Sequence, residues 1–438
     1  MSLPRYPTYK DSGVDWLGEV PGHWGVLPIK RSFRIVGGST PKSDSESLWA
    51  GDILWATPTD LSKRASVYIS DTERKISTAG LESCAATMVP KGSIILSTRA
   101  PIGSLAIADA ELCTNQGCKS LVPSPGTHSV YFAHLLNVST AQLNIRGKGT
   151  TFLELSAEAL GAFATPTPPF AEQAYIAAFL DREAAKIDAL VAEQQRLIEL
   201  LQEKRRAVIS HAVTKGLNPA APMKDSGIAW LGEVPRHWEI LRGSQIGTLF
   251  GSEPVPEESV CSEGDLPFIK VGSMSLDSFA IESWNWFVDD AVAGRYRPRT
   301  GYVVFPKRGA AIFSNKVNIV DRPSLIDPNL MGWQIGSKAT TRFVAYVLKC
   351  RKLDELADVS TVPQINNKHI APERFPIPPL GEQRAIVACL DSETAKLDTL
   401  TAQAQRAIDL LQERRTALIS AAVTGQIDVR PAAERASA

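Results

Sequence analysis

The 438-residue chain lacks most features that mark secreted, membrane-spanning or metal-binding proteins. Its six cysteines form no C-x-x-C pair and its six histidines form no ligand cluster, so reduced thiols are indicated rather than disulfides or zinc sites. No run of about 18 apolar residues could span a membrane. The first residues lack the apolar segment of a secretory signal. These absences predict a cytoplasmic protein.

Catalytic motifs are also missing. No G-x-x-x-x-G-K-[ST] sequence is present to bind phosphates, and RGKGTT at 146–151 has the wrong order. The TPPF sequence at 167–170 lacks the leading Asn or Asp of an amino-methyltransferase loop, and a helix start explains it better. No H-E-x-x-H pattern indicates a metal site. The sequence predicts no catalytic residue, metal or cofactor in this chain.

Neither positive nor negative charge dominates the composition. Lys plus Arg and Asp plus Glu each number 47, and hydrophobic residues make up 44% of the chain. The composition is that of an ordinary globular protein with sizeable cores. Zero net charge argues against a general polyanion binder, although a locally basic groove remains compatible with it.

What the chain does have is repetition. Residues 10–24 read KDSGVDWLGEVPGHW and residues 224–238 read KDSGIAWLGEVPRHW, with 12 of 15 positions identical. We call these two segments the constant motifs. A longer repeat relates residues 166–214 to residues 376–424, with 29 of 49 positions identical. The segments between these repeats share little sequence. The chain is therefore two tandem halves, each with a constant motif, a variable domain and a constant helical segment.

This division predicts five segments. The first variable domain with its constant motif covers residues 1–165, and the first helical segment covers 166–215. The linker, second constant motif and second variable domain cover 216–375. The second helical segment covers 376–425, and a tail predicted to be disordered covers 426–438.

Each helical segment has apolar residues at alternating steps of four and three, which predicts a long amphipathic helix with a coiled-coil seam. Neither helix can bury its seam alone, so we expect each to pack against the other. The predicted seam residues are Ile176, Leu180, Ile187, Leu190, Leu197, Leu201, Val208, Ile386, Leu390, Leu397, Leu400, Leu411 and Leu418.

Charged residues in the same rows favour antiparallel packing. Glu183 and Glu393 lie near the helix starts, whereas Lys204 and Arg414 lie near the ends. In an antiparallel pair, an acid can meet a base. Alternatively, these positions are partly exposed seam ends with long, extended side chains. An antiparallel pair of equivalent helices has a two-fold axis, as duplex DNA does.

The doubled WLGEVPxHW, PPxxEQxxI…LD and LLQE(K/R)R…IS.AVT motifs resemble the specificity subunit of type I restriction–modification systems. The resemblance implies an α+β fold, with two α/β target-recognition domains joined and spaced by two long helices packed as an antiparallel coiled coil. It implies a non-catalytic reader of a split, asymmetric double-stranded DNA target. Two modification (methyltransferase) subunits and the restriction subunits would be its partners, carrying S-adenosylmethionine, ATP and magnesium.

Aromatic and imidazole side chains recur in the constant motifs. Trp16, Trp24, Trp230 and Trp238 are expected in loops, where they either pin the motif to the helices or contact a modification subunit. His23 and His237 precede two of them. A structural clasp explains these histidines better than a catalytic pair, because no partner is evident nearby.

Candidate DNA contacts in the first domain lie in polar or glycine-containing loops. Arg side chains can bind guanine or phosphate, Asn and Gln pair with adenine, and glycines permit close approach. The candidates are Arg99, Asn115, Gln116, Lys119, Arg146 and Lys148. A surface Arg at a turn is the alternative interpretation of Arg99.

The second domain has an equivalent set. Gly301 and Arg308 align with Gly92 and Arg99 at an offset of 209, which suggests a shared fold. The cluster RYRPR suits phosphates. The candidates are Arg295, Arg297, Arg299, Lys307, Arg308, Asn315, Lys316, Gln364, Asn366, Asn367 and Lys368.

Two other functions remain open at this point. A coiled-coil scaffold bridging two proteins explains the helices and the repeat, but not why the large domains diverge within a constant frame. A fused methyltransferase or nuclease is disfavoured by the missing motifs.

Overall fold

The computed structural model describes residues 4–62, 67–99, 101–149, 153–358 and 362–430. The chain forms two compact units. The first contains Met1–Gln194 and Arg406–Ala438, and the second contains Gln195–Gln405. The long helices α6 (Phe170–Lys215) and α11 (Leu380–Val423) contribute to both units. None of the helices among the described residues is long and apolar enough to cross a membrane.

The first unit contains a main sheet, a small sheet and two strand pairs. The main sheet has the order β4 (Phe33–Gly37), β11 (Cys118–Pro123), β8 (Ile94–Ser97), β9 (Leu105–Ala108) and β6 (Tyr68–Ile69). Its first four strands are antiparallel, and β6 runs parallel to β9. The small sheet has the order β10 (Cys113–Thr114), β5 (Ile53–Ala56) and β7 (Lys75–Ile76). The pairs are β1 (Tyr9–Asp11) with β2 (Glu19–Pro21) and β3 (Gly25–Pro28) with β12 (Ala164–Thr167).

Short helices complete this unit. They are α1 (Pro58–Ser62), α2 (Thr78–Glu82), α3 (Ser129–Val138), α4 (Thr140–Ile145) and α5 (Ala157–Gly161), with 3-10 turns η1 (Ile29–Arg31) and η2 (Glu46–Leu48). Hydroxyl caps begin two of them, because Ser77 accepts a hydrogen bond from the amide of Gly80 and Ser156 from that of Ala159.

The second unit has corresponding sheets. Its main sheet has the order β16 (Gly247–Phe250), β23 (Leu330–Ile335), β20 (Tyr302–Pro306) and β21 (Asn318–Val320). Its small sheet has the order β17 (Val260–Cys261), β19 (Phe287–Val288), β18 (Leu266–Ile269) and β22 (Leu325–Ile326). The strand pairs are β13 (Met223–Asp225) with β14 (Glu233–Pro235) and β15 (Glu239–Arg242) with β24 (Arg374–Ile377).

The helices of the second unit are mostly short. They are α7 (Gly243–Ile246), α8 (Asp290–Ala293), α9 (Thr341–Arg351) and α10 (Asn367–Ile370), with 3-10 turns η3 (Glu257–Ser259), η4 (Val271–Ser273), η5 (Ala310–Ser314) and η6 (Asp354–Leu356).

The two variable domains share one topology. The order β4-β11-β8-β9 is repeated by β16-β23-β20-β21, and both sets are antiparallel. In the small sheets, β5 and β18 each have one parallel neighbour and one antiparallel neighbour. The shared fold suggested by the alignment of Arg99 with Arg308 is therefore confirmed, although the sequences diverge.

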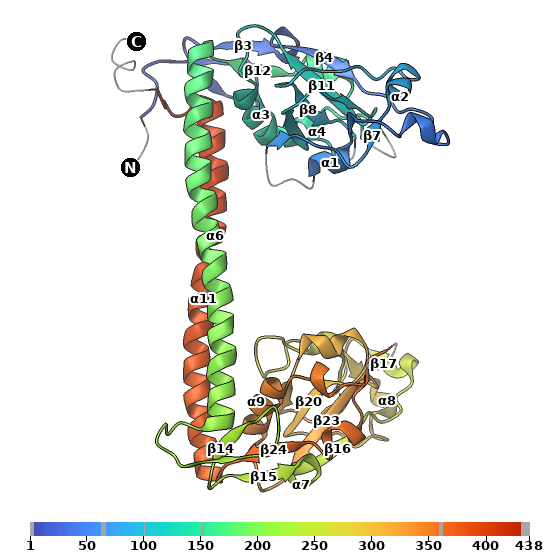
Figure 1. Ribbon diagram of the computed structural model, residues 1–438, viewed down its shortest axis with the longest axis vertical. Coiled ribbons are helices and arrows are strands. Elements are labelled where there is room, and N and C mark those ends of the chain that lie inside the picture. The colour runs from blue at the N-terminus through green and yellow to red at the C-terminus, as the bar shows by residue number, and fades with distance from the viewer. Residues whose placement is uncertain (1–3, 63–66, 100, 150–152, 359–361, 431–438) are drawn as a thin grey trace. The chain divides into compact units, whose positions relative to one another are not determined.

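The core of the first unit joins its main sheet to its helices. Helix α3 lies between the sheet and the α6–α11 pair (Figure 1), and its Tyr131 and Phe132 are fully buried. The Tyr131 hydroxyl donates to the carbonyls of Pro166 at 3.1 Å and Val423 at 3.0 Å. Ile176 of α6 and Ile419 of α11 belong to the same apolar cluster. The variable domain is thereby anchored to both helices.

The second unit repeats this arrangement with different residues. Phe343 and Tyr346 of α9 are buried in one cluster with Val213 of α6 and with Ile386 and Leu390 of α11. The Tyr346 hydroxyl donates to Asp391 at 2.6 Å. Burial, together with this hydrogen bond, raises the pKa of Tyr346 to about 12.

The helices pack antiparallel within each unit, as predicted. In the first unit, Asp188 of α6 lies 3.0 Å from Arg415 of α11. In the second unit, Arg205 of α6 forms an ion pair with Asp398 of α11. The predicted pairing of acid with base holds, although these ion pairs use other residues than predicted. Of the predicted pairs, Lys204 adds to the effect of the Lys396 hydrogen bond in lowering the pKa of Glu393. Glu183 instead pairs with Lys186 on its own helix, at 2.8 Å.

Three of the thirteen predicted seam residues are wrong. Leu190, Leu197 and Leu400 are 45%, 41% and 46% exposed, so they face away from the partner helix. The remaining predicted residues are buried or half-buried: Ile176, Leu180, Ile187, Leu201, Val208, Ile386, Leu390, Leu397, Leu411 and Leu418.

Along the part of each predicted row that contains these leucines, the seam is shifted by one residue. Buried or half-buried side chains occupy Ala184, Val191, Ile198, Arg205, Thr394, Thr401, Ile408 and Arg415. Two heptad rows overlap in this sequence, and the row with more leucines is not the buried one. Ala184 and Thr394 are buried in the seam, whereas the neighbouring Glu183 and Glu393 are half-buried and each pairs with a lysine of its own helix.

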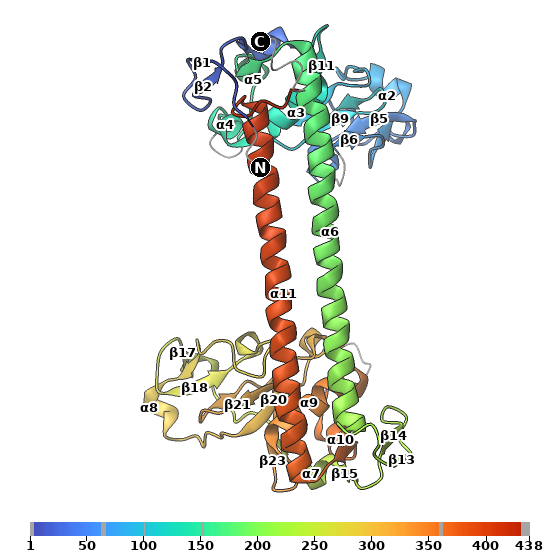
Figure 2. The same cartoon turned by 90° about the vertical axis from the view of Figure 1, so that its left-hand side faces the viewer.

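Each constant motif forms a hairpin beside a helix end. In the first unit, the β1–β2 hairpin lies beside the end of α11 (Figure 2), where the Tyr9 hydroxyl donates to the carbonyl of Gly425 at 3.1 Å. In the second unit, the β13–β14 hairpin lies beside the end of α6, where Lys215 donates to the carbonyl of Glu233 at 2.5 Å.

Part of the tail predicted to be disordered is packed. Asp428 is 1% exposed, and its amide donates to the carbonyl of Pro4 at 2.8 Å. Residues 431–438 lie outside the described residues. Residues near the start and the end of the described chain are therefore in contact in the first unit.

Candidate nucleic-acid interface

Two loops of the first variable domain meet at one residue. Arg99 and Lys148 each form an antiparallel bridge with Glu154. The Lys148 and Glu154 backbones exchange hydrogen bonds of 3.0 and 2.9 Å, and the amide of Leu155 donates to Thr98 at 2.9 Å. The Arg99 guanidinium lies 3.0 Å from the Glu154 carboxylate. The structure thus brings together two predicted residues around an acidic residue that sequence reasoning missed.

The second domain has the same arrangement. Arg308 and Asp358 each form an antiparallel bridge with Gln364. The amide of Asp358 donates to Gln364 at 3.0 Å, and that of Ile365 donates to Lys307 at 2.9 Å. A pocket of about 160 Å³ at this place is lined by Lys307, Arg308, Pro328, Gln364 and Asn366. Four of these five residues were predicted from the sequence.

We call these two sets of residues the bridged clusters. They consist of Arg99, Lys148 and Glu154 in the first unit and of Arg308, Asp358 and Gln364 in the second. The arginine is common to both, whereas the residue opposite it is an acid in one and an amide in the other. The backbone frame is therefore shared, while the side chain opposite the arginine differs between the two units.

Other predicted residues of the first domain lie outside the bridged cluster. The Asn115 side chain accepts a hydrogen bond from the amide of Gly117 at 3.0 Å, so it supports its own loop. Gln116 is exposed and accepts a hydrogen bond from Thr40. Lys119 is half-buried on β11, opposite Gly37. Arg146 donates to the carbonyl of Gln142 at 3.0 Å and stacks on Phe163.

The basic cluster of the second domain is exposed. Arg295, Arg297 and Arg299 all lie on the surface. Arg299 lies over the Phe250 ring, 4.4 Å from its centroid, and with Arg297 it lines a small pocket of about 50 Å³. Their exposure leaves the guanidinium groups accessible to phosphates.

Two predicted residues are used inside the protein. Asn315 has a left-handed backbone (φ 49°) and links Lys349 to Leu353, donating to the first at 2.9 Å and accepting from the second at 3.1 Å. Lys316 donates to the carbonyl of Met274 at 2.7 Å. These contacts give both side chains a structural role.

The start of α10 presents three predicted polar residues to solvent. Asn366, Asn367 and Lys368 are exposed. The Lys368 amine lies 2.9 Å from Asp358 of the bridged cluster, and this hydrogen bond lowers the pKa of the Asp358 carboxyl. Lys368 therefore extends the bridged cluster of the second unit.

The constant motif of the first unit is held by Glu172, at the start of α6. This glutamate is 4% exposed. It accepts hydrogen bonds from Tyr6 at 2.5 Å and Trp24 at 3.1 Å, and it lies 2.8 Å from His23. Burial and the hydrogen bond to Glu172 raise the pKa of Tyr6 far above its usual range. We call these residues with Arg430 the Glu172 clasp.

The second unit has a simpler version of this clasp. His237 lies 2.7 Å from Glu382, the equivalent of Glu172. Sequence reasoning assigned a clasp to the two histidines but missed their carboxylate partners. The signal was present, since a Glu recurs in both helix starts and a His in both motifs.

The tryptophans of the constant motifs pack inward. Trp24 and Trp238 are 0% and 1% exposed. Trp16 stacks on Phe163 at 5.5 Å between ring centroids, and Trp230 packs edge-on against Phe375. All four lie in turns or loops, and these contacts favour the packing interpretation of their role.

The glutamine after each clasp glutamate holds the variable domain. Gln173 accepts a hydrogen bond from the amide of His128, which precedes α3, at 2.9 Å. Gln383 accepts one from the amide of Thr340, which precedes α9, at 2.8 Å. The repeated Glu–Gln pair therefore ties the constant motif and the variable domain to the same turn of helix.

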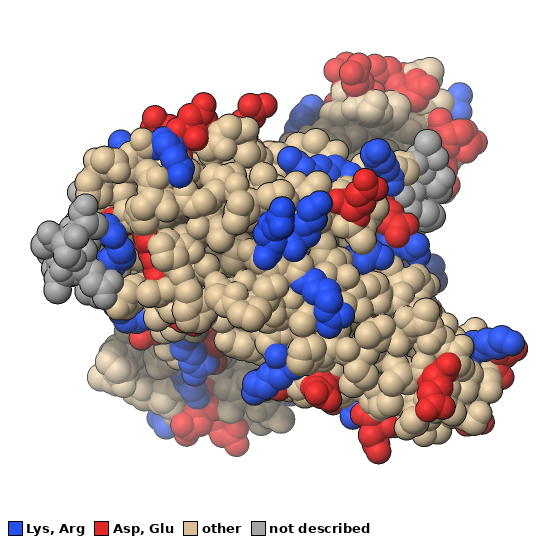
Figure 3. All heavy atoms as spheres, turned by 90° about the horizontal axis from the view of Figure 1, so that it is seen from above, with Lys and Arg blue, Asp and Glu red and all other residues tan. Residues whose placement is uncertain are grey.

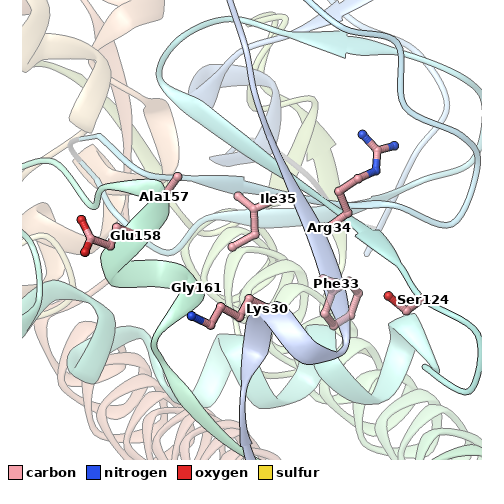
Figure 4. Close-up of a pocket in the computed structure, with 8 residues that line it drawn as sticks. All are labelled: Lys30, Phe33, Arg34, Ile35, Ser124, Ala157, Glu158 and Gly161. Atoms are coloured by element: carbon pink, nitrogen blue, oxygen red, sulfur yellow. The ribbon is translucent and has the colours of Figure 1, made fainter.

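A shallow pocket of about 470 Å³ lies in the first unit between β4 and α5 (Figure 4). Phe33 and Ile35 form its apolar part. The Lys30 side chain points toward α5, whereas the Arg34 guanidinium points away from it. Helix α5 begins three residues after Glu154, so this pocket lies close to the bridged cluster along the chain.

Charge on the surface is mixed. On the face of the first unit nearest the viewer in Figure 3, Lys and Arg side chains are spread across the middle, with Asp and Glu mostly toward the rim. Among the described residues, no group of three His, Cys, Asp or Glu side chains is placed to hold a metal ion.

Comparison with known proteins identifies the family of the chain. The family described as "Type I restriction modification DNA specificity domain" matches residues 21–200 and 235–409, once in each half. The chain is 30% identical over 314 residues to the type I restriction enzyme MjaIX specificity subunit of Methanocaldococcus jannaschii, covering 69% of this chain and 70% of that protein. It is 21% identical over 327 residues to the EcoDI specificity subunit of Escherichia coli, covering 68% and 70%.

Solved structures share the fold. A chain described under "Structural basis underlying complex assembly and conformational transition of the type I R-M system" has a TM-score of 0.74 at 17% identity, covering 92% of this chain and 98% of that one. The HsdS subunit from Thermoanaerobacter tengcongensis has a TM-score of 0.55 at 16% identity, covering 93% and 98%. The chain belongs to the family of type I restriction–modification specificity subunits, the subunits that recognise DNA.

Proposed function

We propose that the chain reads a bipartite, asymmetric DNA target, with one half-site bound by each variable domain. The observation that carries this proposal is the pair of bridged clusters. They have the same backbone frame but different side chains at Glu154 and Gln364. Two identical sites would suit a symmetric target, whereas two different sites suit an asymmetric one.

The constant parts of the chain suit shared protein partners. Two modification subunits would bind equivalent surfaces, and exposed leucines recur at equivalent positions. Leu190 and Leu410 are 45% and 65% exposed in the first unit, and Leu200 and Leu400 are each 46% exposed in the second. Exposed apolar side chains that recur in this way suit a protein interface better than solvent. Restriction subunits would join through this complex.

The chain itself would be non-catalytic and would act in the cytoplasm. Its arginines, lysines and amides position and read DNA, which is binding chemistry. S-adenosylmethionine would belong to the modification subunits, and ATP and magnesium to the restriction subunits. The runner-up function, a protein scaffold without DNA readout, does not account for two divergent bridged clusters in one frame.

Genome-wide mapping of methylated adenines tests this proposal. A host carrying the chain and its modification partner is compared with the same host after deletion of this chain. We expect a split, asymmetric motif that disappears in the deletion strain. A methylation pattern that is unchanged by the deletion, with the partner subunits expressed and assembled, would favour the scaffold.

A further inference from the structure

We propose that Glu154 and Gln364 determine which bases the two half-sites contain at one equivalent position each. Arg99 with Glu154 would read a G·C pair, and Arg308 with Gln364 would read a guanine and a neighbouring adenine. This inference rests on the proposed function and names the residues that carry its specificity.

The first argument is the fixed position of these side chains. Arg99 faces Glu154, and Arg308 faces Gln364, across antiparallel bridges. Directly opposed residues in such a bridge have β-carbons about 5 Å apart, on the same face. Backbone hydrogen bonds of 2.9–3.0 Å hold the Glu154 strand segment to both of its neighbours. The two side chains of each pair are therefore held next to each other, at the equivalent place in each domain.

The second argument is the chemistry of the first pair. The major-groove edge of a G·C pair offers two acceptors on guanine and one donor on cytosine. An arginine supplies the donors for guanine, and a glutamate accepts from the cytosine amine. Arg99 and Glu154 lie 3.0 Å apart and are 45% and 41% exposed. An ion pair this exposed contributes little to folding, so its main effect is to orient both groups before DNA binds.

The third argument is the difference in the second pair. Gln364 has an amide that both donates and accepts, and this matches the N7 and N6 groups of adenine. With Arg308, Lys307 and Asn366 it lines the pocket of about 160 Å³. Guanine would bind Arg308, and the amide would select the adjacent adenine. The two domains would thus share a contact from arginine to guanine, but the side chain next to the arginine would contact a different base in each half-site.

The test uses the full chain assembled with its modification subunits and a library of randomised DNA duplexes, with methylation as the readout. In the Glu154→Gln variant, we expect the preference for G·C at one position of the first half-site to fall by about 5- to 100-fold, the size of one good base contact. In the Gln364→Glu variant, we expect the preference for adenine to fall similarly at one position of the second half-site. The matched control Glu111→Gln removes an exposed carboxylate outside the bridged cluster and should change neither half-site.

The outcomes separate this inference from the proposed function. If the wild-type complex methylates without sequence preference, the proposed function fails. If the wild type is specific but Glu154→Gln keeps every preference, or changes the other half-site, this inference alone is overturned. Should Glu154→Gln also lower the melting temperature, Glu154→Asp decides, since it keeps the charge but shortens its reach. If the inference is right, Glu154→Asp weakens the preference for G·C at the same base pair.

Discussion

Asp188 and Arg415 form an ion pair between α6 and α11, with the charged atoms 3.0 Å apart. Asp398 and Arg205, at the equivalent positions of the other helix in each case, form the same pair in the second unit. Both side chains of the first pair are more than one-third exposed, so the pair is worth ~0.5 kcal/mol. Its larger role is to favour antiparallel pairing, because a parallel register would bring like charges together.

Charge reversal tests this role. Arg415→Glu places two acids side by side and should lower the free energy of unfolding by about 1 kcal/mol. Combining it with Asp188→Arg should restore most of that loss, as measured by urea denaturation. A double variant no more stable than Arg415→Glu alone would show that the pair does not couple the helices.

The Glu172 clasp should contribute more than its counterpart in the second unit. Glu172→Ala leaves the buried hydroxyl of Tyr6 and the indole N–H of Trp24 without their acceptor. We expect a loss of about 3 kcal/mol in the free energy of unfolding. Glu382→Ala is the matched control, because that side chain is 27% exposed against 5% for Glu172. It should cost about 1 kcal/mol. Equal losses in the two variants would contradict a special role for the buried clasp.

Contacts between the chain ends should stabilise the first hairpin. A chain ending at Gly425 loses the hydrogen bond from Asp428 to Pro4 and the stacking of Arg430 on Tyr6, 5.0 Å from the ring centroid. We expect hydrogen exchange in β1 and β2 to become faster by about tenfold or more, because the local stability of the hairpin falls by ~1.5 kcal/mol. A chain ending at Arg430 keeps these contacts and is the control. Unchanged exchange in the shorter chain would show that the hairpin is held by the helices alone.

Lys349 should make the stability of the second unit depend on alkaline pH. Burial is the main cause that lowers the pKa of its amine from 10.5 to about 8. Between these two values the unfolded chain binds more protons than the folded chain, so stability rises with pH there. We expect a gain of about 1–3 kcal/mol from pH 8 to 10.5. Urea denaturation of Lys349→Met should lack this gain, whereas the exposed control Lys352→Met should keep it.

The sequence predicts the tandem organisation well, because the repeated segments can be aligned directly. The two constant motifs, the two helices and the shared fold of the variable domains all follow from aligned positions. The seam was harder to predict. Two heptad rows overlap, and hydrophobicity alone favours the row containing Leu190 and Leu197. The structure buries the other row, which contains small residues such as Ala184. Whether that row can be buried depends on how closely the two helices approach each other.

The sequence predicted only part of the candidate site, because the rest depends on contacts between segments that are distant in the chain. Arg99 and Lys148 could be selected as basic residues in loops, but Glu154 could not, since an acid is not an obvious DNA contact. Only the pairing of segments about 50 residues apart places it opposite Arg99. The sequence alone explains Glu172 only as a favourable negative charge near a helix start. Its clasp role depends on Tyr6, His23 and Trp24, which reach it from about 150 residues away.

Lengthening both helices together should change the spacing between half-sites but not the half-sites themselves. Because Asp188 pairs with Arg415, Leu190 lies level with Glu413 in the antiparallel pair. One heptad inserted after Leu190 and another after Gln412 preserves the seam and adds about 10 Å of helix. At about 3.4 Å per base pair, we expect a spacer longer by about two to three base pairs, as mapped by adenine methylation. A heptad in α6 alone breaks the pairing register and serves as the control, which should lose methylation. An unchanged spacer, or altered half-sites, in the doubly extended chain would refute a spacing role for these helices.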